Sequence, residues 1–321
     1  MNKILIIQTA FIGDVILATS VVEKLHQFYP ESKIDFLLRK GNESLLENHP
    51  HINEVIVWKK KDNKYKNLIR TALNVKKYNY DLVVNLQRFA SSGLITALSG
   101  AKHKLGFKKN PLSFTFTKQF EHKIGDGTHE VERNQQLIND LTDDVALNPK
   151  LYPSNKAYAD VAEYKTENYV CMAPTSVWST KELPKEQWVK LINKTSDKTI
   201  VYLLGGPVDA DKCEEIKQLS GNKNVVNLSG KLSFLASAAL MQNAQMNYVN
   251  DSAPLHIASA TNAPVTAYFC STIPSFGFGP LSDNKTIVEV TEKLSCRPCG
   301  LHGKKSCPEG HFNCGFKIDI S

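Results

Sequence analysis

Asp14 stands at a position where open α/β domains carry out their chemistry. It follows the apolar run "KILIIQ" (3–8) and the short turn "TAFIG" (9–13), and a helical pattern begins after it. Such domains bind ligands beyond the carboxyl ends of their strands, where this turn would lie. The turn lacks the glycine-rich phosphate motifs, and a carboxylate there would repel a phosphate. Asp14 is therefore either a capping or first-turn acid of the helix or a general base.

Two stretches in the second half of the sequence carry residues that suit the binding of a phosphate or a ribose. "MAPTSVWSTKELP" (172–184) leaves a strand and places hydroxyls and a cation, including Ser176 and Lys181, ahead of a helix. Hydroxyls and a lysine near a helix start suit phosphate binding. "LLGGPVDAD" (203–211) follows a strand with two glycines and then acids. It predicts either a ribose-binding turn or a plain connection between a strand and a helix.

"VNDSAPLHIASATNAPV" (249–265) is the most informative stretch. A strand ends before Asp251 and Ser252, and a helix of small residues starts near Pro254, a favoured first helical position. The free N–H groups and the dipole of that helix start would receive a diphosphate. His256 lies in the first turn and is either a ligand to the same group or a structural histidine.

The elements that must position these residues alternate between strand and helix. Strands are expected at 3–8, 33–39, 52–58, 80–87 and 103–107, with helices between them. A polar, proline-containing segment follows at 147–168, and a second alternation of similar size begins at 169. We therefore expect an α/β protein of two Rossmann-like, doubly wound domains facing across a cleft, with domains at 1–155 and 156–321.

Composition is that of an ordinary globular protein of 321 residues with a formal net charge of +7. Basic runs at 58–66, 75–77 and 102–109 all lie in the first half, where they indicate either a solvated face or an anionic partner. The sequence contains no stretch of 18 or more apolar residues, so no membrane-spanning helix is expected. No small-residue cleavage site follows the first apolar run, so this run is expected to be a strand and not a signal peptide. We expect a cytoplasmic protein. The modest charge argues against nucleic acid as a partner.

Four of the seven cysteines gather near the end of the sequence. Cys296, Cys299, Cys307 and Cys314 are spaced C-x2-C-x7-C-x6-C in a glycine-rich stretch. Structural zinc, local disulfides and free thiols all fit this spacing, although a reducing compartment counts against disulfides. None of the three alternatives makes the cluster catalytic.

With these residues in view, the chain resembles the ADP-heptose–lipopolysaccharide heptosyltransferases over nearly its whole length. The resemblance is carried by the order and spacing of five stretches, which are "FIGDVILATSVVEKLHQFYP", "NLQRFASSGLITALSGAKHKLGF", "HEVERN" (129–134), "PTSVWSTKELP" and "NDSAPLHIASATNAPVTAYF". It implies the GT-B fold and an inverting transfer that needs no metal. A heptose would pass from ADP-heptose to a Kdo or heptose hydroxyl of the lipopolysaccharide inner core.

The resemblance also implies roles for single residues. Asp14 matches the family's catalytic base. Ser176 and Lys181 match residues that hold the donor diphosphate. Asp251, Ser252 and His256 match the loop and helix start that bind the same nucleotide-sugar.

The chain departs from the family pattern at the helix start, where Ala253 replaces a frequent glycine and Ser252 a common threonine.

The acceptor-binding candidates are Arg88 and the run Lys59–Lys61, with Lys60 at its centre, because the lipopolysaccharide core is anionic. A lipid-linked acceptor would also imply peripheral contact with the inner face of the cytoplasmic membrane. Two alternatives stay open, a GT-B transferase with another nucleotide-sugar for a surface glycan and a non-catalytic nucleotide- or glycan-binding protein.

Overall fold

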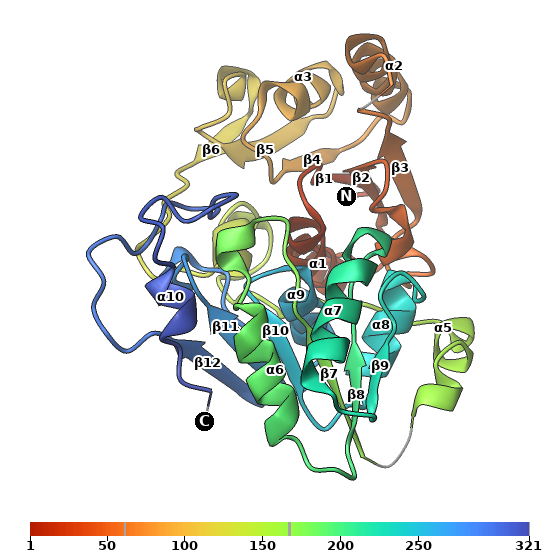
Figure 1. The fold of residues 1–321 in the computed structure, drawn as a ribbon. Helices are drawn as coiled ribbons and strands as arrows, with labels where there is room; N and C mark the ends of the chain where they lie inside the picture. The colour runs from red at the N-terminus through yellow and green to blue at the C-terminus, as the bar shows by residue number, and fades with distance from the viewer. Residues whose placement is uncertain (61, 166–167, 321) are drawn as a thin grey trace. The chain divides into compact units, whose positions relative to one another are not determined.

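The structure, a computed structural model, describes residues 1–60, 62–165 and 168–320. The chain forms two compact units, Met1–Tyr152 (unit 1) and Pro153–Ser321 (unit 2). Their boundary lies three residues before the expected 155. Each unit is an α/β layer structure of its own (Figure 1).

Unit 1 is built on a six-stranded sheet in the order β3-β2-β1-β4-β5-β6, and every neighbouring pair is parallel. The strands are β1 (Lys3–Ile7), β2 (Lys33–Arg39), β3 (Glu54–Trp58), β4 (Leu82–Asn85), β5 (His103–Phe107) and β6 (Lys118–Phe120). The central strands are buried almost throughout. This explains their continuous apolar sequence, since a strand covered on both faces has no solvent side to alternate with.

Helices cover both faces of this sheet. Helices α2 (Lys64–Lys77) and α3 (Ala90–Leu98) contact each other and pack Leu68, Val75 and Ile95 onto one face. Helices α1 (Ile12–Phe28) and α4 (Glu130–Gln135) contact each other, and α1 lies on the other face (Figure 1). Single 3-10 turns are η1 (Glu43–Leu46), η2 (Ser113–Thr115) and η3 (Asn139–Leu141).

Unit 2 repeats this topology. Its sheet has the order β12-β11-β10-β7-β8-β9, again parallel throughout. Counted from its own first strand, this is the 3-2-1-4-5-6 arrangement of a Rossmann fold, which unit 1 also has. The strands are β7 (Tyr169–Ala173), β8 (Ile200–Leu203), β9 (Val225–Asn227), β10 (Asn247–Asn250), β11 (Val265–Phe269) and β12 (Lys285–Glu289).

The helices of unit 2 also form two layers. Helices α6 (Lys185–Lys194), α7 (Ala210–Ser220) and α10 (Asn313–Phe316) share one core through Trp188, Cys213 and Cys314. Helices α8 (Phe234–Met241) and α9 (Ala253–Ala260) contact each other, and α5 (Asn155–Ala159) packs on α8. The remaining short turns are η4 (Ala162–Tyr164), η5 (Ser179–Lys181), η6 (Pro207–Asp209) and η7 (Pro274–Phe276).

The predicted fold class is confirmed, and strands β6 and β12 are among the elements that the sequence did not predict. Both lie at the end of a sheet and are largely exposed, with sequences "KQF" and "KTIVE". Edge strands carry no continuous apolar run, so hydrophobic patterning does not find them. Within the described residues, no helix has the length and hydropathy needed to cross a bilayer.

Candidate active site

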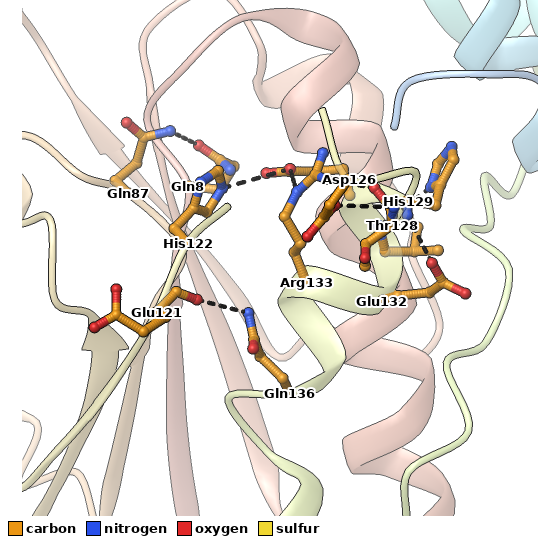
Figure 2. Close-up of polar contacts among 12 residues, drawn as sticks. Gln8, Gln87, Glu121, His122, Asp126, Thr128, His129, Glu132, Arg133 and Gln136 are labelled. Carbon is orange, nitrogen blue, oxygen red and sulfur yellow. Dashed lines mark hydrogen bonds and ion pairs between the residues drawn. The ribbon is translucent and has the colours of Figure 1, made fainter. Parts of the chain in front are cut away.

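The strand order of unit 1 reverses between β1 and β4, and the residues that follow these two strands share one crevice region. Helix α1 starts after β1 with Phe11 as its cap residue, so Asp14 is a first-turn acid and not the cap. After β4, the Gln87 amide donates a hydrogen bond to the Gln8 side chain, which ties the two strand ends together (Figure 2). Asp14 and Arg88 therefore belong to the same switch point.

The proton affinity of Asp14 is unusual for a carboxyl group. Its pKa is raised to about 6, mainly by burial and also by the negative charge of Glu130, while backbone N–H groups and Arg88 act in the opposite direction. An aspartate that served only as a first-turn acid of a helix would have its pKa lowered by the helix dipole. An aspartate with a pKa near 6 has the proton affinity that a general base requires close to neutral pH.

Glu130, whose negative charge raises the pKa of Asp14, belongs to a buried ionic cluster at the start of α4. Its Oε2 lies 2.7 Å from Arg133 Nε and 3.6 Å from His122 Nε2, and all three side chains are buried. The hydrogen bond from His122 and the charge of Arg133 outweigh burial, so the pKa of Glu130 is lowered and the group stays ionised.

The stretch "HEVERN" supplies this cluster together with its own helix start. His129 caps α4 by accepting a hydrogen bond from the Val131 N–H, and Glu132 accepts one from the His129 N–H at 2.6 Å. This reciprocal arrangement is a capping box, with histidine in the place of serine or threonine. It fixes the first turn of α4, which carries Glu130.

Cations lie at the carboxyl ends of the neighbouring strands. Arg88 follows β4, and Lys60 follows β3 with its ammonium group 5.7 Å from the Trp58 ring centroid. Burial, Arg39 and Lys64 lower the pKa of Lys60, so these three cations are close enough to repel one another. An anionic ligand would relieve that repulsion. Lys61, the last member of the predicted lysine run, lies outside the described residues.

Unit 2 places its own polar residues at the equivalent switch point, between β7 and β10. Lys181 Nζ lies 2.7 Å from Asp251 Oδ2, and the Thr272 hydroxyl donates to the same oxygen at 2.6 Å. Lys181 comes from the loop after β7, Asp251 from the end of β10 and Thr272 from the end of β11. The structure thus brings together two of the five residues predicted to bind the donor.

The other three lie in the same two loops. The Ser176 N–H donates to Glu182 Oε1 at 2.9 Å, which closes the loop after β7. Ser252 is the cap residue of α9, but its hydroxyl does not bind the helix N–H groups, so it can bind a ligand there. His256 is buried, with its ring edge-on to Phe278 at 6.5 Å. Burial agrees with a structural histidine, and its role as a ligand stays a prediction.

Contacts within the turn after β8 explain why it contains two glycines. Asp209 accepts a hydrogen bond from the Gly206 N–H at 2.7 Å, and a Cβ on Gly205 would lie 2.8 Å from the Asp209 Cβ. The glycines therefore make room for a neighbouring side chain. This geometry supports the plain strand-to-helix connection over a ribose-binding turn.

The cysteine-rich segment packs against the loop that carries Lys181. The Lys304 N–H donates to the Thr180 hydroxyl at 2.7 Å, and the Cys299 N–H donates to the Ser271 carbonyl at 2.9 Å. Arg297 donates to the Phe269 and Cys270 carbonyls at the end of β11 and to the Thr272 carbonyl. The segment thus braces the Lys181–Asp251 pair from outside.

The thiols themselves are not joined. All seven cysteines are free, and Cys296, Cys299 and Cys307 are half-buried. Burial, together with the neighbouring thiols, raises the pKa of Cys314 to about 11, which keeps that group protonated. No set of three His, Cys, Asp or Glu side chains in the described part of the chain is arranged to bind a metal ion. The structure thus shows the four cysteines as separate thiols.

Three residues that contribute to the two switch points were not predicted from the sequence. Glu130 was part of a recognised stretch but had no assigned role, and Arg39 and Thr272 were not singled out. The position of Arg39, at the carboxyl end of a buried strand, was the available signal. Thr272 had none, because its contact with Asp251 joins two strands that are adjacent only in the folded sheet.

The chain is similar in sequence to known glycosyltransferases. The sequence profile of glycosyltransferase family 9 (heptosyltransferase) matches residues 68–310. Lipopolysaccharide heptosyltransferase 3 of Escherichia coli K12 is 29% identical over 279 residues, which cover 81% of this chain and 80% of that protein.

Solved structures agree in fold. The structure of E. coli ADP-heptose lps heptosyltransferase II has a TM-score of 0.79 at 20% identity and covers 92% of this chain and 95% of its own. E. coli heptosyltransferase WaaC with ADP has a TM-score of 0.72 at 20% identity, covering 89% and 92%.

Proposed function

Because this chain belongs to glycosyltransferase family 9, the heptosyltransferases, we propose that it transfers a heptose from ADP-heptose to a sugar hydroxyl of the lipopolysaccharide inner core. The accepting hydroxyl would belong to a Kdo or a heptose. The observation that carries the proposal is Asp14, a carboxylate at the switch point of unit 1 with a pKa of about 6. Such a group is ionised near neutral pH and can still accept a proton as the bond forms.

In the proposed reaction, Asp14 takes the proton of the attacking hydroxyl. The hydroxyl oxygen forms the new bond to the anomeric carbon with inversion, and the bond from that carbon to the diphosphate breaks. ADP leaves with the electron pair of the broken bond. The cations near the strand ends of unit 1, including Arg88 and Lys60, would bind the anionic acceptor.

Unit 2 would hold the donor. Lys181 is the cation of its switch point, and Ser176 and Ser252 offer hydroxyls in the two loops beside it. The start of α9 adds the positive end of the helix dipole. Together these groups would bind the diphosphate and stabilise the charge that grows on it as it leaves. The Asp251 carboxylate positions Lys181 in the structure described, so we expect it to orient that cation toward the donor.

The resemblance to the heptosyltransferases implies a transfer that needs no metal, and the proposed donor site offers the Lys181 cation and hydroxyl donors that can bind a diphosphate. On the strength of this resemblance, we propose a reaction without a bound metal. A lipid-linked acceptor would be presented at the inner face of the cytoplasmic membrane, so we also propose that the enzyme works there as a peripheral protein.

A transfer assay tests the proposal. Purified protein is incubated with ADP-heptose and lipopolysaccharide truncated to end in Kdo or in one heptose, and the product masses are measured. We expect a mass gain of one heptose with one of the two acceptors, and the accepting substrate identifies the step.

Asp14→Asn should reduce this transfer by about 10²- to 10⁴-fold, the usual contribution of a general base, without changing ADP affinity. Glu186→Gln is the matched control, because Glu186 is also a first-turn acid, in α6, and removing it costs only the helix-dipole interaction. ADP binding without transfer to either acceptor would contradict the proposed donor or acceptor. Transfer by Asp14→Asn within tenfold of wild type would remove Asp14 as the base.

A further inference from the structure

Helix α2 has an exposed face that its own unit does not use. Its inner side packs Leu68, Ala72 and Val75 into the core of unit 1. On its outer side, Tyr65, Ile69 and Leu73 are 76%, 45% and 52% exposed. These three residues, the α2 stripe, are spaced i, i+4 and i+8. A residue of an α-helix is rotated by about 100° from the one before, so the stripe occupies an arc of about 80°.

The charged residues of α2 are all of one sign. Lys64, Lys66, Arg70, Lys76 and Lys77 are exposed, and the helix contains no Asp or Glu. By the same rotation, Lys66, Arg70 and Lys77 lie within about 60° of the edge of the stripe. No salt bridge in the described part of the chain involves any of the five cations. An apolar stripe beside a row of free cations is the arrangement of helices that lie in a membrane interface.

Another surface helix of the same molecule shows the contrast. Helix α7 has the sequence "ADKCEEIKQLS", in which acids and bases alternate, and Leu219 is its single exposed large apolar residue. Scattered apolar residues and mixed charges are ordinary for a solvated surface. Helix α2 differs from it both in the alignment of its apolar residues and in the sign of its charges.

We infer that the outer face of α2, formed by Tyr65, Ile69 and Leu73 with the adjacent cations, docks on a lipid bilayer that contains anionic lipids. A protein partner fits this face less well, because lysine is depleted in protein interfaces. Nucleic acid would pair with the cations, but Ile69 and Leu73 offer it neither a hydrogen bond nor a stacking surface. The inference deepens the proposed function, since a lipid-linked acceptor would be reached from such a surface. Docking itself requires no catalysis.

Vesicle sedimentation with the full-length protein tests the inference. Vesicles of phosphatidylcholine, with and without phosphatidylglycerol, are mixed with wild type and variants. We expect wild type to bind the anionic vesicles, to bind neutral vesicles weakly, and to lose binding as salt is raised. Ile69→Gln combined with Leu73→Gln should lower the partition constant more than tenfold. Lys66→Gln combined with Arg70→Gln should lower it about 25-fold, since one cation near an anionic surface contributes about fivefold.

The matched control removes two exposed apolar residues elsewhere. Val208 and Leu219, in unit 2, are 94% and 55% exposed. Val208→Gln combined with Leu219→Gln should leave vesicle binding unchanged. Circular dichroism spectra that match wild type would show that the variants are folded, as expected for substitutions at exposed positions.

Three results would overturn the inference. Wild type could fail to bind anionic vesicles, or the Ile69 and Leu73 double variant could bind as wild type does. Light scattering could also show a dimer that the double variant abolishes, which would assign the face to a second copy of the chain.

Transfer to a delipidated, soluble acceptor separates this inference from the proposed function. The double variant should keep that activity, and vesicle binding by a protein without transfer activity would contradict only the proposed function.

Discussion

At the scale of single residues, the charges around Asp14 decide how it can act. Burial and Glu130 raise the pKa of Asp14 and Arg88 lowers it, and the balance of these effects is a pKa of about 6. The ion pair with Arg133 and the contact with His122 keep Glu130 ionised, so this influence persists across the neutral range. The buried cluster that includes Glu130 therefore influences the pKa of Asp14, the proposed base.

The pH dependence of transfer follows from these signs. Asp14 must be ionised to accept a proton, so kcat/KM should rise as pH increases through about 6 and then level off. Glu130→Gln removes a charge that raises the pKa of Asp14, so the midpoint should move to lower pH. Arg88→Gln removes a charge that lowers it, so the midpoint should move to higher pH.

Measured pH–rate profiles of wild type and both variants check this prediction. A loss of activity without a change in midpoint would show that Glu130 and Arg88 act only on structure or on binding. Glu130→Gln also leaves the buried Arg133 without its partner and should lower stability, by as much as about 3–5 kcal/mol for a fully buried pair. Arg88→Gln carries no such cost and keeps the test informative if the first variant unfolds.

Lys181 is the residue on which donor binding should depend most. Lys181→Ala removes the cation at the switch point of unit 2 and should weaken ADP binding by roughly tenfold to a hundredfold, the range for a charge-assisted hydrogen bond. Isothermal titration with ADP measures the effect. Lys185→Ala is the control, because Lys185 lies on the surface of α6 and pairs with Glu215 of α7. Equal affinities for the two variants would place the diphosphate elsewhere.

At the scale of elements, the cysteine-rich segment acts as a brace for the donor-side loop. Its backbone bonds to Thr180 and Ser271 hold the residues beside Lys181 and Thr272 in place. Gly303 passes so close to this loop that a Cβ would lie 2.9 Å from Lys181 Cγ and 3.1 Å from Thr180 Oγ1. The four cysteines are thus part of a supporting element, whose contacts with the site are made by its backbone and by Arg297.

A pair of glycine substitutions tests this bracing. Gly303 and Gly300 both have positive φ, +72° and +89°, and a Cβ on Gly300 would meet nothing within 4 Å. Alanine at either position should cost about 1–2 kcal/mol of stability through backbone strain. Gly303→Ala alone should also displace Lys181 and weaken ADP binding roughly tenfold, as expected for a lost charge-assisted bond. Similar ADP affinities for both variants, by calorimetry at matched folded fractions, would argue against the brace.

At the scale of the whole molecule, two units of the same topology carry different chemistry at equivalent points. The switch point of unit 1 holds an acid with a raised pKa near several cations, and that of unit 2 holds a lysine paired with an aspartate. Each open sheet creates its crevice at the reversal of strand order, whatever residues lie there. One topology, used twice, can therefore serve an acceptor and a donor.

Hydrogen exchange of the full-length protein with ADP tests this division. ADP should slow amide exchange most in the loop after β7, around residues 174–183, and at the start of α9, around residues 251–256. The amides at the start of α1 should change less. Strongest protection at the start of α1 would contradict the assignment of the donor to unit 2.

The sequence by itself determined the two sheets and the loops that carry chemistry. Buried parallel strands need continuous apolar runs, and loops at their carboxyl ends stand out by their polar residues, as "TAFIGD" and "NDSAPLH" do. The placement of Asp14, Lys181 and Asp251 just beyond the carboxyl ends of strands therefore follows from local sequence patterns. The resemblance added their roles, which the proposed experiments test.

Only the tertiary structure decided how these residues are charged and held. The pKa of Asp14 depends on Glu130, which lies 116 positions later, and the partner of Lys181 lies 70 positions later. Folding brings such residues together across neighbouring strands and helices, and no local pattern records the contact. The same reason explains why Thr272 and the brace at Gly303 were not predicted. Electrostatic interactions depend on distance and burial in the folded chain, whereas sequence patterns report only which elements form and which face they bury.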